Sequence, residues 1–313
     1  MPTLPPGRAP RRRPGSRLSP PGRAAIALIP LLVGGGPLAA ERPANLATDR
    51  LVAWCIVPFD AVKRSPEERA AMLAELGLTR CAYDWREEHV PTFEREILAY
   101  KGRGLTMFAF WGSHEEAFRL FEKHGIHPQV WQTAPSPAGE TDAEKVAAAV
   151  AELTPLARRT ADLGCPLGLY NHGGWGGEPA NLVAVCEGLR RAGFSHVGVV
   201  YNLHHGHGHI ADWPDVLRAL RPYLICLNLN GMNDGANPKI VSVGRGQHDR
   251  AMLETIVRSG YDGPVGIIGH RAELDARVAL AESLAGLDGL FETTTATGPP
   301  AAGTPHVPSA SGR

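Results

Sequence analysis

Short apolar runs alternate with longer amphipathic segments from about residue 51 to about residue 290 of the chain. The apolar runs have the length of strands, and the segments between them carry apolar residues at the spacing of one helix face. This pattern predicts strands at residues 51–57, 79–84, 105–111, 128–131, 166–170, 197–201, 224–229 and 265–268. It predicts helices at residues 66–76, 92–101, 113–124, 141–163, 179–192, 213–220, 248–258 and 272–285, with Ser65 and Ser113 as N-caps of the first and third.

Strands that alternate with helices form a parallel sheet. Eight such units in about 240 residues predict a single α/β domain, a closed (β/α)8 TIM barrel. An open, doubly wound sheet is the alternative. It is disfavoured because residues 56–61, Ile-Val-Pro-Phe-Asp-Ala, contain no glycine-rich phosphate turn after the first strand. Neither a P-loop nor a GxSxG motif occurs in the sequence.

The two ends of the chain do not follow this repeat. Residues 1–40 combine an Arg- and Pro-rich start, a short apolar run at residues 24–33 and small residues up to Ala40. This order is typical of a secretory signal peptide and predicts export to the periplasm or beyond. The alternative is a Pro-rich extension of a cytoplasmic enzyme. Residues 292–313 are rich in Thr, Ala, Gly and Pro and predict a disordered tail, which leaves a domain at residues 41–291.

Composition and charge narrow the choice of partners. The chain has 32 Lys and Arg against 32 Asp and Glu, so electrostatics give no reason to expect nucleic acid or an anionic membrane as partner. Its five cysteines are dispersed and include no CxxC pair, so neither a zinc knuckle nor a disulfide framework is predicted. No cysteine follows the apolar run in a position for a lipid anchor. The oligomeric state is left open.

Polar and aromatic residues gather just past the predicted strand ends, on the face of a barrel that carries active sites. In any single loop, Asn and His would most simply satisfy backbone groups. Their recurrence after successive strands instead predicts a small-molecule pocket. The residues concerned are Asp84, Trp111, Asn171, His172, Trp175, Glu178, Asn202, His204, His205, His207, Asn228, Asn230 and His270.

Three segments carry a family resemblance. They are residues 243–249, Val-Gly-Arg-Gly-Gln-His-Asp; residues 260–263, Gly-Tyr-Asp-Gly, before the last strand; and residues 202–205, Asn-Leu-His-His, after the sixth. With them the sequence resembles the xylose isomerase-like barrels, which include sugar isomerases and epimerases, inosose dehydratases and endonuclease IV. Residues 170–175 and 228–232 resemble an exported subgroup described as sugar phosphate isomerase/epimerase.

The resemblance also shows where this chain departs from the family. Typical members hold one divalent cation with carboxylates after strands five, six and eight. The family's acids after strands five and six match Asn171 and Asn202 here, and its acid at strand eight aligns with Ile268 or His270. The matching position after strand seven is Asn228. Mn²⁺ and Mg²⁺ bind amide oxygens weakly. A divalent metal is therefore left open, and its ligands would be the imidazoles of His172, His205, His207 and His270, which suit Zn²⁺.

The resemblance implies an isomerase or epimerase acting on a sugar or keto-sugar by proton abstraction next to a carbonyl. Glu178 and Asp84 are the candidate bases, although Glu178 equally suits the N-terminus of the helix that begins at Pro179. His205 matches a substrate-contacting histidine of the family and would shuttle a proton. Amides and Lys239 would bind hydroxyls or the oxyanion, and aromatic rings would stack on the sugar. The proposed binding residues are Asn171, His172, Trp175, Asn202, Asn228, Asn230, Trp111 and His270.

Two other functions remain open at this point. One is a His-ligated zinc lyase or hydrolase. The other is a carbohydrate-binding barrel that kept its pocket without catalysis. Endonuclease activity is disfavoured because neither a carboxylate-rich metal site nor a basic groove is visible in the sequence.

Overall fold

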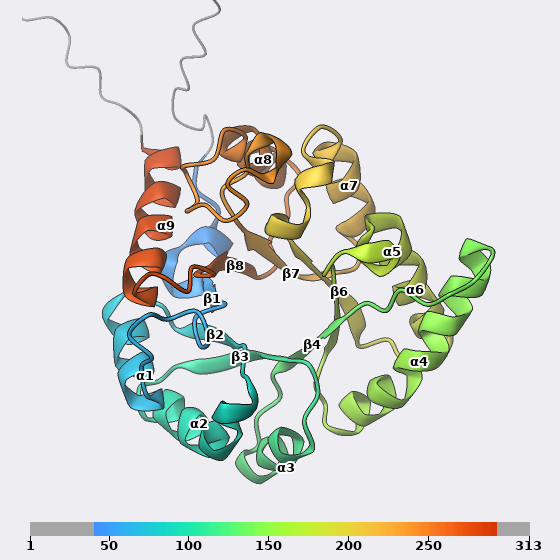
Figure 1. Cartoon of the computed structure of the whole chain (residues 1–313), viewed down its shortest axis with the longest axis horizontal. Helices are drawn as coiled ribbons and strands as arrows, with labels where there is room; N and C mark the ends of the chain where they lie inside the picture. Colours follow the sequence, from blue (N-terminus) through green and yellow to red (C-terminus); the bar gives the residue numbers. More distant parts are fainter. Residues whose placement is uncertain (1–40, 293–313) are drawn as a thin grey trace, which may run out of the picture. The chain divides into compact units, whose positions relative to one another are not determined.

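The computed structural model describes residues 41–292. Within them, eight parallel strands close into one barrel in the order β1 to β8, and helices surround it (Figure 1). The predicted (β/α)8 fold is therefore confirmed. The predicted signal segment at residues 1–40 and the tail from residue 293 lie outside the described residues, so export and a disordered tail stay predictions. In the described part of the chain, no helix is both long and apolar enough to span a membrane.

The structure places most elements close to the predicted ranges. The strands are β1 (Val52–Trp54), β2 (Arg80–Tyr83), β3 (Thr106–Trp111), β4 (Gln129–Thr133), β5 (Leu167–Tyr170), β6 (Val197–Asn202), β7 (Leu224–Leu229) and β8 (Val265–Ile268). The helices are α1 (Pro66–Glu75), α2 (Phe93–Gly102), α3 (Glu115–His124), α4 (Asp142–Asp162), α5 (Gly174–Gly177), α6 (Pro179–Arg191), α7 (Trp213–Leu220), α8 (Asp249–Arg258) and α9 (Ala276–Phe291).

Local capping explains where several helices begin. A capping box opens α1, in which the Ser65 side chain accepts from the Glu68 N–H and the Glu68 carboxylate accepts from the Ser65 N–H at 2.8 Å. The predicted cap of α3 was wrong by one residue. His114, and not Ser113, occupies the cap, and its Nδ1 accepts from the Glu116 N–H at 3.2 Å.

The last helix begins four residues later than predicted, at Ala276 instead of residue 272. The Asp60 carboxylate accepts from the Ala276 N–H at 3.1 Å, and Arg64 bridges Asp60 and Asp275 at 2.9 and 2.7 Å. These contacts join the loop after β1 to the start of α9. The residues between β8 and α9 therefore form a loop, at the end of the barrel where the loop after β1 also lies.

Small residues shape the barrel interior, which side chains from the strands fill. A Cβ on Gly168 would lie 2.5 Å from Val200 Cγ2 and 3.0 Å from the Trp131 ring. A Cβ on Gly198 would lie 2.4 Å from Ile225 Cγ2. Glycine at these positions of β5 and β6 therefore leaves the space that larger neighbouring side chains occupy. The buried interior set comprises Val52, Trp54, Cys55, Ala82, Ala109, Trp131, Tyr170, Val200, Cys226 and Ile268.

A buried ion pair joins α1 to α2. Arg69 Nη1 donates to both carboxylate oxygens of Glu96, at 3.1 and 2.9 Å, and Arg69 Nη2 donates to the Arg64 carbonyl at 2.8 Å. The side chains are 3% and 0% exposed. Burial raises the pKa of Glu96, and the neighbouring guanidinium opposes that rise.

Replacing Arg69 by Met leaves the Glu96 carboxylate buried without its partner. We expect R69M to lower the free energy of unfolding by about 3–5 kcal/mol in urea titrations at neutral pH. The double variant R69M/E96L removes both charges and should recover most of the loss. If R69M unfolds at the same urea concentration as the wild type, the pair does not contribute to stability.

Candidate functional site

Four aromatic rings form the floor of the barrel mouth, at the C-terminal ends of the strands. The Trp54 ring lies 4.9 Å from Trp131 and 5.6 Å from Trp111, measured between centroids. Tyr170 lies 4.8 Å from Trp111, and its hydroxyl accepts from Trp54 Nε1 at 3.1 Å. Sequence reasoning singled out Trp111 alone. The inward alternation of side chains along β1 and β5 is the signal that would have added Trp54 and Tyr170.

Four histidines, His172, His204, His205 and His270, pack together above this floor, and we call them the histidine cluster. Ring centroids are 4.6 Å apart for His172 and His205, 3.6 Å for His204 and His205, and 5.5 Å for His204 and His270. His205 also lies edge-on to Tyr170 at 5.9 Å. The loops after β5, β6 and β8 thus bring together residues nearly 100 positions apart, as the sequence predicted for a barrel mouth.

Burial keeps three imidazoles of this cluster, those of His204, His205 and His270, neutral at pH 7. Burial lowers the pKa of His205 to about 3, and repulsion from His172 and Lys239 adds to this effect. Burial also lowers the pKa of His204 and His270. A neutral imidazole offers one N–H donor and one acceptor nitrogen. The Nδ1 atoms of His204 and His270 are buried and have no partner among the described residues. Each of these nitrogens thus leaves one hydrogen-bonding group of the cluster unused by the described residues.

Two of the predicted amides hold strand ends together. Asn171 Oδ1 accepts from the Asn202 N–H at 2.7 Å, and Asn171 Nδ2 donates to the Asn202 carbonyl at 3.1 Å. Asn202 Oδ1 accepts from the His204 N–H at 3.2 Å, and Asn202 Nδ2 donates to the Tyr170 hydroxyl. These two amides hold the backbone next to His204 and His205, and their own side-chain atoms are already hydrogen-bonded.

The two amides of β7 differ from each other. Asn230 Nδ2 donates to the carbonyls of Gly231 and Lys239 at 2.7 and 2.9 Å, so this residue holds the loop after β7. Asn228 is fully buried, and its Nδ2 has no partner in the described part of the chain. Its amide lies over Gly266, where an added Cβ would be 2.0 Å from Asn228 Oδ1. Of these four amides, Asn228 keeps its N–H groups free.

Asp84 is a buried carboxylate at the end of β2 and is 2% exposed. Its Oδ1 accepts from the backbone N–H groups of Ile56 and Val57 at 3.3 and 3.1 Å, while its Oδ2 has no partner within residues 41–292. Burial raises the pKa of Asp84 to about 7, against a smaller opposing effect of these N–H donors and of Arg86. Asp84 therefore exists in both protonation states near neutral pH.

The other sequence-predicted residues lie at the rim. The Glu178 side chain is 58% exposed and pairs with His209 Nε2 at 3.1 Å, and it makes no side-chain cap to α6. Trp175 Nε1 donates to Asp142 Oδ1 at 2.9 Å, so its ring is engaged with the start of α4. His207 Nδ1 contacts the His204 carbonyl at 3.1 Å. Lys239 is exposed on the loop after β7.

The donor set at the mouth does not fit a divalent metal. Within the described residues, no three His, Cys, Asp or Glu side chains converge in a way that would hold an ion. None of the positions that match the family's acids carries a carboxylate, and the side-chain oxygens of Asn171 and Asn202 already accept backbone hydrogen bonds. We therefore derive no chemical step through a metal.

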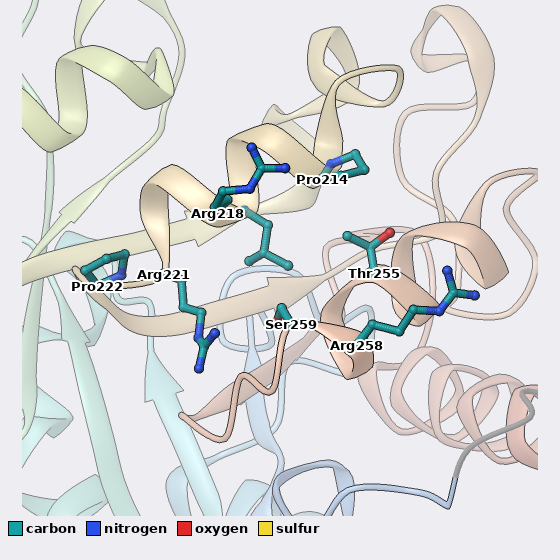
Figure 2. A pocket seen from close by; sticks show the side chains of 8 residues that line it. Pro214, Arg218, Arg221, Pro222, Thr255, Arg258 and Ser259 are labelled. Carbon is teal, nitrogen blue, oxygen red and sulfur yellow. The ribbon is translucent and has the colours of Figure 1, made fainter.

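A separate cleft of about 670 Å³ lies on the outer surface between α7 and α8 (Figure 2). Its lining includes Arg218, Arg221 and Arg258, of which Arg218 pairs with Asp215 at 2.7 Å and Arg258 pairs with Glu254. The lining contains no acid, histidine or cysteine. The mouth, and not this cleft, therefore carries groups suited to proton transfer.

No family model and no curated protein sequence matches the chain. Solved structures do match it in fold. The 3-keto-D-glucoside 4-epimerase YcjR from E. coli is 16% identical, with a TM-score of 0.59 over 76% of this chain and 98% of that one. The probable 3-DHS dehydratase AsbF from Bacillus anthracis is 12% identical, with a TM-score of 0.61 over 76% and 99%. The D-psicose 3-epimerase from Clostridium cellulolyticum H10 is 13% identical, with a TM-score of 0.55 over 77% and 97%.

At these identities the likeness shows a shared fold. The chain therefore shares the barrel fold of these three structures, two of which are named as sugar epimerases. The matches cover nearly the whole of each solved chain. The shared fold therefore includes the end of the barrel at which Asp84 and the histidine cluster lie.

The raised pKa of Asp84 predicts a pH-dependent stability. The folded protein holds this proton up to about pH 7, whereas a carboxyl in the unfolded chain loses it near pH 4, so stability falls as pH rises between these values. Asp84→Asn keeps an oxygen for the Ile56 and Val57 N–H groups and removes the titration. Urea titrations from about pH 4 to about pH 8 should show a flatter profile for D84N. Parallel profiles would mean that Asp84 ionises at its ordinary pKa.

Chelation tests the metal assignment directly. Because no three ligands converge, we expect the purified protein to contain no stoichiometric zinc, and EDTA to leave its melting temperature unchanged. A melting temperature that falls with EDTA and recovers with Zn²⁺ would establish the histidine-ligated site instead. The variant His172→Gln would then be expected to abolish that recovery.

Proposed function

We propose that this protein is an enzyme, a carbohydrate isomerase or epimerase that moves a proton on the carbon next to a carbonyl group. The fold it shares with sugar epimerases supports the substrate class. The observation that carries the proposal is Asp84, a carboxyl group buried at the end of a barrel strand, with one free oxygen and a pKa raised to about 7. A general acid or base works best when its pKa lies near the working pH.

Epimerisation removes a proton from one face of a carbon and returns one to the other face. Asp84 follows β2 and His205 follows β6, and these strands stand four places apart in a ring of eight. The two groups therefore approach the mouth from opposite walls. In one direction neutral His205 accepts a proton from the substrate and protonated Asp84 supplies one to its other face. In the opposite direction the ionised Asp84 carboxylate accepts a proton and the His205 imidazolium supplies one.

The remaining groups of the mouth would bind the sugar and its enolate. The Trp54 and Trp111 rings offer an apolar floor to one face of the sugar. The free N–H groups of Asn228 and the unpartnered nitrogens of His204 and His270 offer hydrogen bonds to hydroxyls and to the developing oxyanion. These donors would take the role that a cation plays in a carboxylate-lined site.

Incorporation of deuterium from D₂O into a panel of sugars and keto-sugars tests the proposal. The substrate should gain deuterium next to its carbonyl, and D84N should slow this exchange by about 10²-fold or more while binding persists. Glu178→Gln serves as a matched control, because its carboxylate is exposed and pairs with His209, and it should leave exchange within about threefold of the wild type.

Other results would redirect the proposal. Binding without exchange for every sugar would identify a non-catalytic carbohydrate-binding barrel. Loss of exchange in E178Q, with D84N unaffected, would assign the base to Glu178 at the rim.

A further inference from the structure

Arg86 and Lys239 are exposed cations on loops at the C-terminal ends of the strands, and neither has a carboxylate partner in residues 41–292. Arg86 follows β2, and its guanidinium carbon lies 5.5 Å from the centre of the Phe59 ring. The Phe59 ring packs in turn on His270 at 3.7 Å. The guanidinium donates one hydrogen bond, to the Trp85 carbonyl at 2.7 Å, and leaves its other N–H groups without a partner in the described residues.

Lys239 lies on the loop after β7, at the same end of the barrel as the histidine cluster. Asn230 fixes the backbone there by donating to the Lys239 carbonyl at 2.9 Å. The ammonium group acts on several histidines at once, because it helps to lower the pKa of His204, His205 and His270. Arg86 lowers the pKa of His270 as well, so both cations reach this end of the cluster.

The acids near the mouth do not neutralise these cations. Glu178 pairs with His209, and Glu282 pairs with Arg271 at 2.6 Å. Asp84 is buried and partly protonated at pH 7. Glu273 is the exposed acid that acts on His270, and its effect there is smaller than those of Arg86 and Lys239. The mouth therefore carries an excess of positive charge in a chain whose formal net charge is zero.

We infer that the substrate carries an anionic group, a carboxylate or a phosphate ester, which Arg86 and Lys239 bind at the mouth of the barrel. This inference rests on the proposed function, since it names the class of sugar on which that site acts. A neutral sugar gains little from two free cations, whereas an anion gains charge-assisted hydrogen bonds from both. The Nδ1 atoms of His204 and His270 have no hydrogen-bond partner in the described residues, and a neutral imidazole nitrogen can donate to an anion.

A matched series of ketoses that differ at carbon 6 tests the charge alone. The probes are D-fructose, D-fructuronate and D-fructose 6-phosphate, and their affinities are measured by calorimetry at low and high salt. At least one anion should bind about tenfold or more tightly than D-fructose at low salt, and the preference should shrink at about 0.5 M salt. The tighter anion identifies carboxylate or phosphate as the group that is recognised.

Single variants then show which side chains bind the anionic group of the probe. Lys239→Gln and Arg86→Gln should each reduce the preference for the anion about fivefold or more. Both side chains are exposed, so folding should be preserved, and matched melting temperatures check this. Arg221→Gln removes an equal charge from the cleft between α7 and α8 and should leave the preference unchanged (Figure 2).

The inference is wrong if D-fructose binds as tightly as both anions, if none of the three binds at about 10 mM, or if R221Q lowers the preference as much as K239Q and R86Q. Deuterium exchange is recorded on the same samples. Preferential binding of an anion without exchange would overturn the isomerase while keeping the anion site, and exchange without charge preference would do the opposite.

Discussion

The hydroxyl of Tyr170 connects opposite walls of the barrel, and the geometry of the mouth depends on it. It accepts hydrogen bonds from Trp54 on β1 and from Asn202 on β6, and Tyr170 itself ends β5. Burial raises the pKa of this hydroxyl, so it remains protonated. Because Asn202 Nδ2 is held in this way, its Oδ1 faces the His204 N–H and begins the turn that carries His204 and His205. The floor and the histidine cluster are thus parts of one hydrogen-bonded arrangement.

Sequence periodicity was sufficient for the barrel and insufficient for some of its boundaries. Local signals, such as Ser65 with Glu68, placed the start of α1 correctly. Strand β1 was predicted to reach residue 57 but ends at Trp54. Cys55 has a φ of +58°, and Asp84 then takes the next two backbone N–H groups out of the sheet. Such contacts join distant parts of the chain, and the local pattern of apolar residues does not contain them.

For the site, the sequence identified which residues gather at the mouth but not which of their atoms are free. Asn171 and Asn228 look alike in sequence, since Asn171 directly follows β5 and Asn228 is the last residue but one of β7. The Asn171 amide is hydrogen-bonded to the backbone of Asn202, whereas the N–H groups of Asn228 have no partner in the described residues. Asp84 and Glu178 were likewise equivalent candidate bases, and burial separates them, at 2% exposure for Asp84 against 58% for the Glu178 side chain. Pairing and burial are properties of the folded chain and cannot be read from residue type.

The amides at the strand ends have a consequence for how the mouth responds to its surroundings. Carboxylates at these positions would change their charge on binding protons or cations, and the repulsion between them would change as well. Asn171 and Asn202 carry no charge at any pH, and their hydrogen bonds to the backbone and to Tyr170 remain the same in acid and in base. The part of the mouth that these two amides hold therefore does not change its charge with pH. Asp84, whose pKa burial raises to about 7, stands apart from these amides and titrates near neutrality.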